Sequence, residues 1–295
     1  MHKKILYLFV LWGCFSTVQG KAAPEVDILA SPDYWGMARS GGAMCDLPDH
    51  VWINPSLIPD TFHYSLSAHL ALMPGDIRVS QITGRYSLHS HVLSGGINYE
   101  NYGEFEGFNA DGFSEDAFHA GRTQIFAAWS YGLSSKLQVG FSYRYVSDKI
   151  ATSQENFSVV TYGITLVPIK GKTRLSFAFT NYPENIDDEA RFSITHPLRY
   201  LPVYVNVDYR YRGKHALENL TLGGYYLSDL PFEFLAGIDF RRGDLQTNAL
   251  GQDYIAGLAI GSRYRYKSLI FQLSAFSYGG LGTVTTFGVN YYHGS

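Results

Sequence analysis

Several short motifs contain residue types that could do chemistry, and their spacing limits what each could do. His89 and His91 would share one face of a strand and could form a metal pair, but no third ligand is identifiable. The acids at 187–189 could hold calcium, although they lack the spaced oxygen ligands of a dedicated loop. The glycines at 279–282 suit a hairpin better than a phosphate-binding turn. No Ser-His-acid or Cys-His set can be assembled, so the sequence predicts a noncatalytic protein without a metal site or cofactor.

The composition limits the kinds of surface on which such residues could be displayed. The chain has 295 residues, of which 46% are hydrophobic, 17% charged and 16% aromatic, and its net charge is -3. Without an excess of Lys and Arg, it has no electrostatic footprint for nucleic acid. The charged fraction is below the value of about 25% that is usual for soluble domains. These properties exclude a nucleic-acid partner and suggest a surface that does not face water.

The amino terminus reads as an export signal. Residues 1–20 combine basic residues, an apolar run and a small residue at the expected cleavage point after Gly20. An alternative is a lipoprotein signal that ends at an acylated Cys14. With cleavage after Gly20 the exported chain keeps one cysteine, Cys45, and no intramolecular disulfide can form. No later run reaches about 18 apolar residues, which excludes a helical membrane protein.

The rest of the chain alternates with a period of two residues, which is typical of strands. In 62–72, apolar residues such as Leu66 and Leu70 alternate with polar ones such as Ser67 and His69. Most of the expected strands have the length of about 9–11 residues that a tilted membrane-spanning strand needs. Fourteen strands are expected, near 62–72, 76–83, 88–99, 122–133, 137–146, 157–167, 173–180, 190–195, 202–212, 218–227, 232–242, 253–264, 268–278 and 283–292.

The lengths of the connections give an independent indication of orientation. Links after even-numbered strands are short, whereas several links after odd-numbered strands are longer, including 101–121 and 147–156. This asymmetry is typical of outer-membrane barrels. We therefore expect an all-β, transmembrane antiparallel β-barrel in the outer membrane of a diderm bacterium, in contact with outer-membrane lipid. The expected divisions are a signal peptide at 1–20, a periplasmic or plug segment at 21–60 and the barrel at 61–295.

A barrel of fourteen strands is too wide for strand side chains alone to fill, so its lumen must be plugged, lined or occupied by a ligand. Inward polar positions could select a solute or hold a plug, or they could form a structural charge network. The expected lumen-lining residues are Asn206, Asp208, Arg210, Glu233, Asp239, Arg241 and Arg263. The expected plug residues are Arg39, Gly41, Gly42, Asp46, Asp49, Asn54 and Pro55.

A second candidate site is the expected loop at 104–119. It carries five acids and four phenylalanines without a Lys or Arg. Exposed aromatics among acids suit a protein-docking patch, although a loop folded over the barrel mouth would have the same composition. The docking candidates are Glu104, Phe105, Phe108, Phe113 and Phe118.

The segment before the barrel carries a resemblance to a known family. It reads Ala38-Arg39-Ser40, then Gly41-Gly42, an acidic stretch at 46–49, and Asn54-Pro55-Ser56-Leu57, where Asn54 could cap a short helix that begins at Pro55. This series, with the stretches at 101–105 and 109–114, resembles the FadL-like outer-membrane barrels of the PorV/PorQ family, and PorQ in particular. The spacer between Gly42 and Asn54 is shorter than in that family.

The resemblance implies a noncatalytic docking or anchoring component of type IX protein secretion, with other secretion proteins as partners. The alternative is a FadL-like channel for uptake of a hydrophobic ligand. A lateral channel needs a kinked strand and an apolar pocket behind it, whereas a docking component needs neither. A third possibility is a soluble periplasmic sheet.

Overall fold

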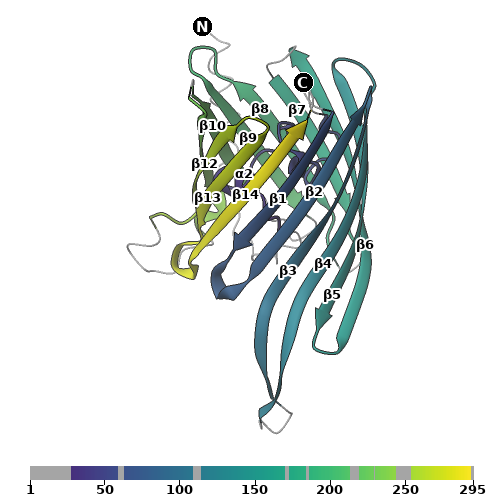
Figure 1. Cartoon of the computed structure of the whole chain (residues 1–295), viewed down its shortest axis with the longest axis vertical. Helices are drawn as coiled ribbons and strands as arrows, with labels where there is room; N and C mark the ends of the chain where they lie inside the picture. Colours follow the sequence, from purple (N-terminus) through teal and green to yellow (C-terminus); the bar gives the residue numbers. More distant parts are fainter. Residues whose placement is uncertain are drawn as a thin grey trace.

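A computed structural model of the chain describes residues 28–58, 63–108, 114–169, 173–183, 186–212, 219–228, 230–243 and 254–293. These residues form fourteen antiparallel strands that close into a barrel, as Figure 1 shows. The expected all-β closed barrel is therefore confirmed. The strands are β1 (Tyr64–Leu72), β2 (Arg78–Leu88), β3 (His91–Phe108), β4 (Ser114–Gly132), β5 (Leu137–Ile150), β6 (Ser153–Ile169), β7 (Thr173–Asn181), β8 (Glu189–Pro197), β9 (Val203–Arg212), β10 (Asn219–Leu227), β11 (Phe232–Asp239), β12 (Leu258–Tyr266), β13 (Leu269–Ser277) and β14 (Thr283–His293).

The sheet closes where β1 pairs with β14. The ladder runs without interruption from Tyr64 opposite His293 to Leu72 opposite Thr285. β1 also pairs with β2 along its whole length. Because both edges of β1 are hydrogen-bonded, the barrel has no free sheet edge here, which is the condition for placing a sheet in lipid.

The two faces of the wall differ in polarity, as the alternation predicts. On β1, Leu66 and Leu70 are exposed on the outer face, whereas Ser67 and His69 are buried on the inner face. The same division occurs on β5, where Tyr143 is exposed and Arg144 is buried. The outer face thus presents apolar and aromatic side chains in a band suited to acyl chains.

Four neighbouring strands, β3 to β6, extend beyond the rest of the barrel at the end opposite to Tyr64 and His293 (Figure 1). The β2–β3 ladder stops at Arg78 opposite Asn101, so residues 102–108 of β3 lie past the end of β2. The β6–β7 ladder likewise stops at Val160 opposite Asn181. We call this four-stranded projection the rim extension.

Two loops expected from the sequence are wrong, because strands of the rim extension continue through them. The expected loop at 101–121 is mostly strand, because β3 continues to Phe108 and β4 begins at Ser114. The expected loop at 147–156 is a tight turn at Ala151 and Thr152 between β5 and β6. The acids and glycines that suggested loops are compatible with strands here because this hairpin lies beyond the neighbouring strands, where charged side chains can face water.

The helices of the described residues are short. They are α2 (Pro32–Gly36) and the 3-10 helices η1 (Pro48–Trp52), η2 (Pro74–Asp76), η3 (Phe240–Gly243) and η4 (Gly279–Leu281). None is long and apolar enough to cross a membrane. The helix expected from Pro55 is wrong: Asn54 instead accepts hydrogen bonds from the backbone N–H and the hydroxyl of Ser56 in a turn. The strand expected at 232–242 ends at Asp239, where η3 begins.

The outward position of Ile125 gives a test of this placement in lipid. Ile125 is 55% exposed and pairs with Ile97, which pairs with Ile82 near the middle of β2. We expect Ile125→Arg to lower the free energy of unfolding in lipid vesicles by about 2–4 kcal/mol, because the guanidinium would face the middle of the hydrocarbon layer. Urea titration followed by tryptophan fluorescence measures this change.

The matched control is Leu281→Arg, at a side chain that is 63% exposed in the η4 turn. This control should change the unfolding free energy by about 1 kcal/mol or less, because the position lies at the rim. Equal effects of the two substitutions would contradict the assignment of the outer face to lipid.

Candidate functional site

Residues 28–58 fill the lumen of the barrel, and we call them the plug segment. Its large side chains are almost completely enclosed, including Trp35, Met37, Arg39 and Leu57 at 0% exposure. Trp35 donates from its indole Nε1 to the carbonyl of Leu29 over 2.6 Å, which satisfies its buried N–H. The plug segment therefore occupies the interior of the barrel in the part of the chain that the structure describes.

Two glycines show how tightly the wall receives the plug segment. A Cβ atom on Gly140 of β5 would lie 2.1 Å from the carbonyl oxygen of Pro55, and one on Gly223 of β10 would lie 2.1 Å from Ser40 Oγ. Both contacts are too close for any side chain, so the backbone of the plug segment can sit at these places because the wall has no Cβ.

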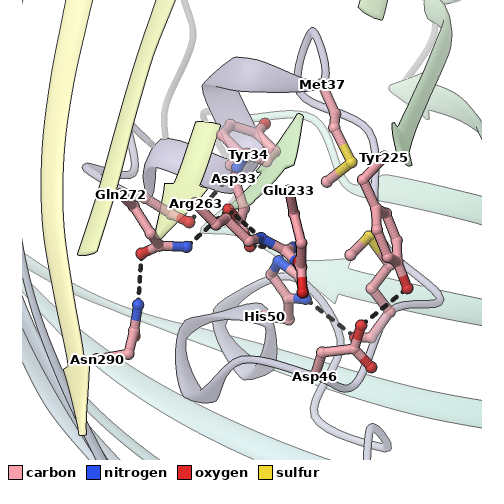
Figure 2. Close-up of polar contacts among 12 residues, drawn as sticks. Asp33, Tyr34, Met37, Asp46, His50, Tyr225, Glu233, Arg263, Gln272 and Asn290 are labelled. Carbon is pink, nitrogen blue, oxygen red and sulfur yellow. Dashed lines mark hydrogen bonds and ion pairs between the residues drawn. The ribbon is translucent and has the colours of Figure 1, made fainter. Parts of the chain in front are cut away.

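A buried network of ion pairs and hydrogen bonds joins α2 to four strands, as Figure 2 shows. Arg263 of β12 donates to both carboxylate oxygens of Asp33, over 2.9 Å for Nε to Oδ1, and its Nη1 lies 2.8 Å from Glu233 Oε2 on β11. Gln272 of β13 donates to Asp33 Oδ1 over 2.6 Å and accepts from Asn290 of β14. Each carboxylate thus has a cationic or amide donor, as buried charges require.

Other predicted lumen residues also contact the plug segment. Arg39 is paired with Asp239, which also accepts from the backbone N–H of Arg241 over 3.0 Å. Asp208 accepts from the N–H of Gly42 over 3.0 Å. Asn206 Nδ2 lies 3.2 Å from the sulfur atoms of Met37 and Met44, and Arg210 Nη1 lies 3.5 Å from the hydroxyl of Tyr34. Arg241 lies on η3, at the end of β11, and its side chain is 19% exposed.

The remaining predicted plug residues lie in the same interior. Gly41 has a φ of 117°, in the region that favours glycine. Asp46 accepts from the hydroxyl of Tyr225 over 2.9 Å, and Pro55 accepts from Ser130 Oγ over 2.5 Å. Asp49 is buried near histidines. Burial by itself raises the pKa of its carboxyl, but His69 and His50 together with hydrogen bonding hold the pKa below its ordinary value.

An apolar pocket of about 500 Å³ lies at the base of the rim extension. On the inner face of the rim extension, the aromatic rings of Phe105 and Phe118 line the pocket and stack with their centroids 5.6 Å apart. The β1–β2 connection forms the opposite side, where Ile77 contributes an apolar side chain. The lining residues are Gly75, Ile77, Tyr102, Phe105, Phe118, Ala120 and Ile150.

A β-bulge shapes this pocket. The β3–β4 register shifts between Asn101 and Gly103, so Tyr102 is an extra residue on β3. Gly103 has a φ of 95°, and its N–H donates to Asn101 Oδ1 over 2.8 Å. The hydroxyl of Tyr102 donates to Glu100 Oε2 over 2.7 Å. The bulge thus turns the Tyr102 side chain toward the pocket and fixes it there.

The predicted docking residues are divided by this geometry. Phe105 and Phe118 lie on paired strands and line the pocket, and Glu104 is exposed on β3. Phe108 ends β3, and Phe113 lies outside the described residues. Sequence reasoning missed the other lining residues, since Ile77 comes from the β1–β2 connection and Tyr102, Ala120 and Ile150 come from three separate strands, and they carry no shared motif.

The motifs considered for metal binding do not come together. No group of three or more His, Cys, Asp or Glu residues suited to a metal is found within the described ranges. His91 stacks on Trp129 and Tyr131 at the outer surface. Asp188 accepts from Asn181 Nδ2 and from the N–H of Tyr182, which ties the β7–β8 connection together.

Substitution of Gly140 tests the close seating of the plug segment. Gly140→Ala should displace the chain around Pro55, because the new Cβ would lie 2.1 Å from its carbonyl oxygen. We expect faster trypsin cleavage after Arg39, which is fully buried in the wild-type barrel. Mass spectrometry of the folded, detergent-solubilised protein detects this cleavage.

Gly84→Ala is the control, because a Cβ there would have its nearest neighbour at 3.9 Å. If Gly140→Ala were as resistant to trypsin as Gly84→Ala, the close seating of the plug segment would be wrong.

Arg263 tests the buried ion-pair network. Arg263→Met leaves Asp33 and Glu233 without their main cation, and we expect a loss of about 3–5 kcal/mol in unfolding free energy. The control is Arg265→Met on the same strand, since the Arg265 side chain is 58% exposed while it pairs with Glu233 over 3.0 Å. This control should lose about 1 kcal/mol or less. Similar losses in urea titrations of the two variants would argue against a structural role for the network.

The fold is that of FadL-like outer-membrane barrels. Similar solved structures include CymD, described as a monoaromatic hydrocarbon channel (TM-score 0.63, 12% identity, covering 90% of this chain and 98% of that one). Others are the toluene transporter TbuX of Ralstonia pickettii (0.59, 12%, 89% and 98%) and a FadL homologue of Pseudomonas aeruginosa (0.54, 12%, 89% and 98%). No protein-family model matches the sequence, and a search of curated proteins found no significant match. At this identity the likeness concerns the fold.

Proposed function

We propose that this protein is an outer-membrane channel for the uptake of hydrophobic small molecules. The observation that carries the proposal is the apolar pocket at the base of the rim extension, which is lined by three aromatic and two isoleucine side chains. The pocket has a volume of about 500 Å³, which is within the range of small-ligand sites. The first strand begins at Tyr64 and the last strand ends at His293, at one end of the barrel, and the pocket lies at the opposite end. In outer-membrane barrels this opposite end is the extracellular one.

The surroundings of the pocket support a route for a bound solute. Ile77 lines the pocket and also packs against the buried cluster that contains Leu29 and Trp35 of the plug segment. The plug segment fills the lumen next to the pocket. Beside the pocket, β3 has no β2 partner beyond Asn101, so the wall is incomplete there. The bulge at Tyr102 lies at this step in the wall. This arrangement favours sideways transfer across the step over passage along the axis.

The structural neighbours are consistent with this proposal. CymD is described as a monoaromatic hydrocarbon channel and TbuX as a toluene transporter. Both are similar to this chain in fold at 12% identity, so the solutes in their descriptions indicate the class of solute to test first. We place the protein in the outer membrane of a Gram-negative bacterium, where its apolar outer face contacts lipid.

A docking role in type IX secretion is the second candidate. One observation favours it: the rim extension projects beyond the barrel and carries exposed acids, Glu104, Glu106 and Asp116, beside Phe105. A partner protein could contact this surface, as the resemblance of the amino-terminal segment to the PorV/PorQ family implies. In that role the protein would copurify with large partners and would transport no solute.

Phe118 separates the two roles. Phe118→Ala removes one aromatic ring from the pocket lining. A contact between this ring and a bound aromatic solute would be worth about 0.5–1.5 kcal/mol, so the substitution should weaken ligand binding roughly 2–10-fold. We expect a matching fall in the initial rate at which bacteria carrying the variant accumulate radiolabelled naphthalene at low concentration. The host should lack other hydrocarbon channels.

Phe141→Ala is the matched control, because Phe141 is 40% exposed on the outer face of β5. It should leave the accumulation rate unchanged at equal amounts of folded protein. If cells with the wild-type protein took up naphthalene no faster than cells without it, the channel proposal would fail.

A further inference from the structure

We infer that the apolar pocket admits uncharged solutes and rejects carboxylate anions. The inference rests on the proposed function and specifies its class of substrate. It starts from the lining itself: none of the seven lining residues carries a formal charge. Its one side-chain hydroxyl, on Tyr102, donates its hydrogen to Glu100. The side chains that form the pocket therefore offer no cation to a bound carboxylate.

A buried carboxylate lies directly behind the lining. Glu100 is completely buried behind Tyr102, and its Oε1 accepts from Gln124 Nε2 over 2.9 Å. The neighbouring cation, Arg122, is engaged by both oxygens of Asp148, over 2.5 Å and 2.7 Å. Arg122 thus already has a carboxylate partner, and it is not among the lining residues. The carboxylate of Glu100 behind the lining is unfavourable for a bound carboxylate and does not affect a hydrocarbon.

The charged residues that flank the lining point away from the pocket. Glu104 pairs with His119, and both alternate with the lining residues Phe105 and Phe118, so they face outward. Arg78 and Lys149 likewise occupy the outward-facing positions of β2 and β5. An anion entering the pocket would lose water without gaining a counter-ion, and such desolvation is unfavourable.

A matched pair of ligands tests this selectivity. Naphthalene and 2-naphthoate share one ring system and differ in a carboxylate that is ionised at neutral pH. Equilibrium dialysis against the full chain in amphipol measures both affinities, with an Ala120→Trp variant, in which the pocket is filled, as the background. We expect naphthalene to bind at least about tenfold more tightly than 2-naphthoate, because the anion would lose water without gaining a counter-ion from the lining.

A charge introduced at the lining should reverse this preference. Ile150 lines the pocket at the end of β5 and is 57% exposed, so a lysine can be accommodated there. Ile150→Lys should strengthen 2-naphthoate binding about tenfold and weaken naphthalene binding, because the ammonium supplies the missing counter-ion. Leu281→Lys adds the same charge at another rim turn, outside the pocket, and should leave the ratio of the two affinities unchanged.

The outcomes separate this inference from the proposed function. If 2-naphthoate bound the wild-type pocket as tightly as naphthalene, the selectivity would be wrong while the channel proposal would stand. A ratio that did not respond to Ile150→Lys would also overturn the electrostatic explanation. If neither ligand bound above the Ala120→Trp background, the pocket would not be a ligand site and the proposed function itself would fail.

Discussion

The pairing of β1 with β14 is the interaction on which the rest of the structure depends. It converts a sheet with two edges into a closed wall, and it separates an apolar outer face from a polar inner face. Once the wall is closed, polar side chains on the inner face have no access to bulk water and need partners within the protein. Several of these partners come from the plug segment, whose Asp33 and Arg39 pair with Arg263 and Asp239. Wall and plug thus depend on each other.

The filled lumen also affects where an apolar pocket can form. Because residues 28–58 occupy the interior, the apolar pocket described above lies beside the plug segment, at the end where β3 to β6 extend past their neighbours. The unequal strand lengths create this space: Tyr102 and Phe105 lie beyond the last β2–β3 pair, and the short β1–β2 connection places Ile77 opposite them. A barrel with a level rim would lack this site.

The strands of the barrel can be predicted from the sequence, whereas the pocket cannot. Alternation such as that of Leu66, Ser67, Ala68 and His69 predicts a strand and the face of each residue, because a strand has a side-chain period of two. It cannot predict partners across the lumen, since Asp33 and Arg263 are 230 residues apart. Acids at 104–106 suggested a loop because composition does not reveal that β3 continues into water. The bulge at Tyr102 depends on the register of two strands, which single-strand patterns do not specify.

The enclosed position of the plug segment has a consequence for assembly in the membrane. Residues 28–58 precede β1 in the chain, yet they contact strands from β2 to β14 through Trp52, Pro55, Ser40 and Pro32. A preformed cylinder would offer these residues no wide entrance, because glycines such as Gly140 already touch their backbone. The hairpins must therefore gather around the plug segment while the sheet is still open. The β1–β14 pairing would then form last, after the plug segment is already enclosed.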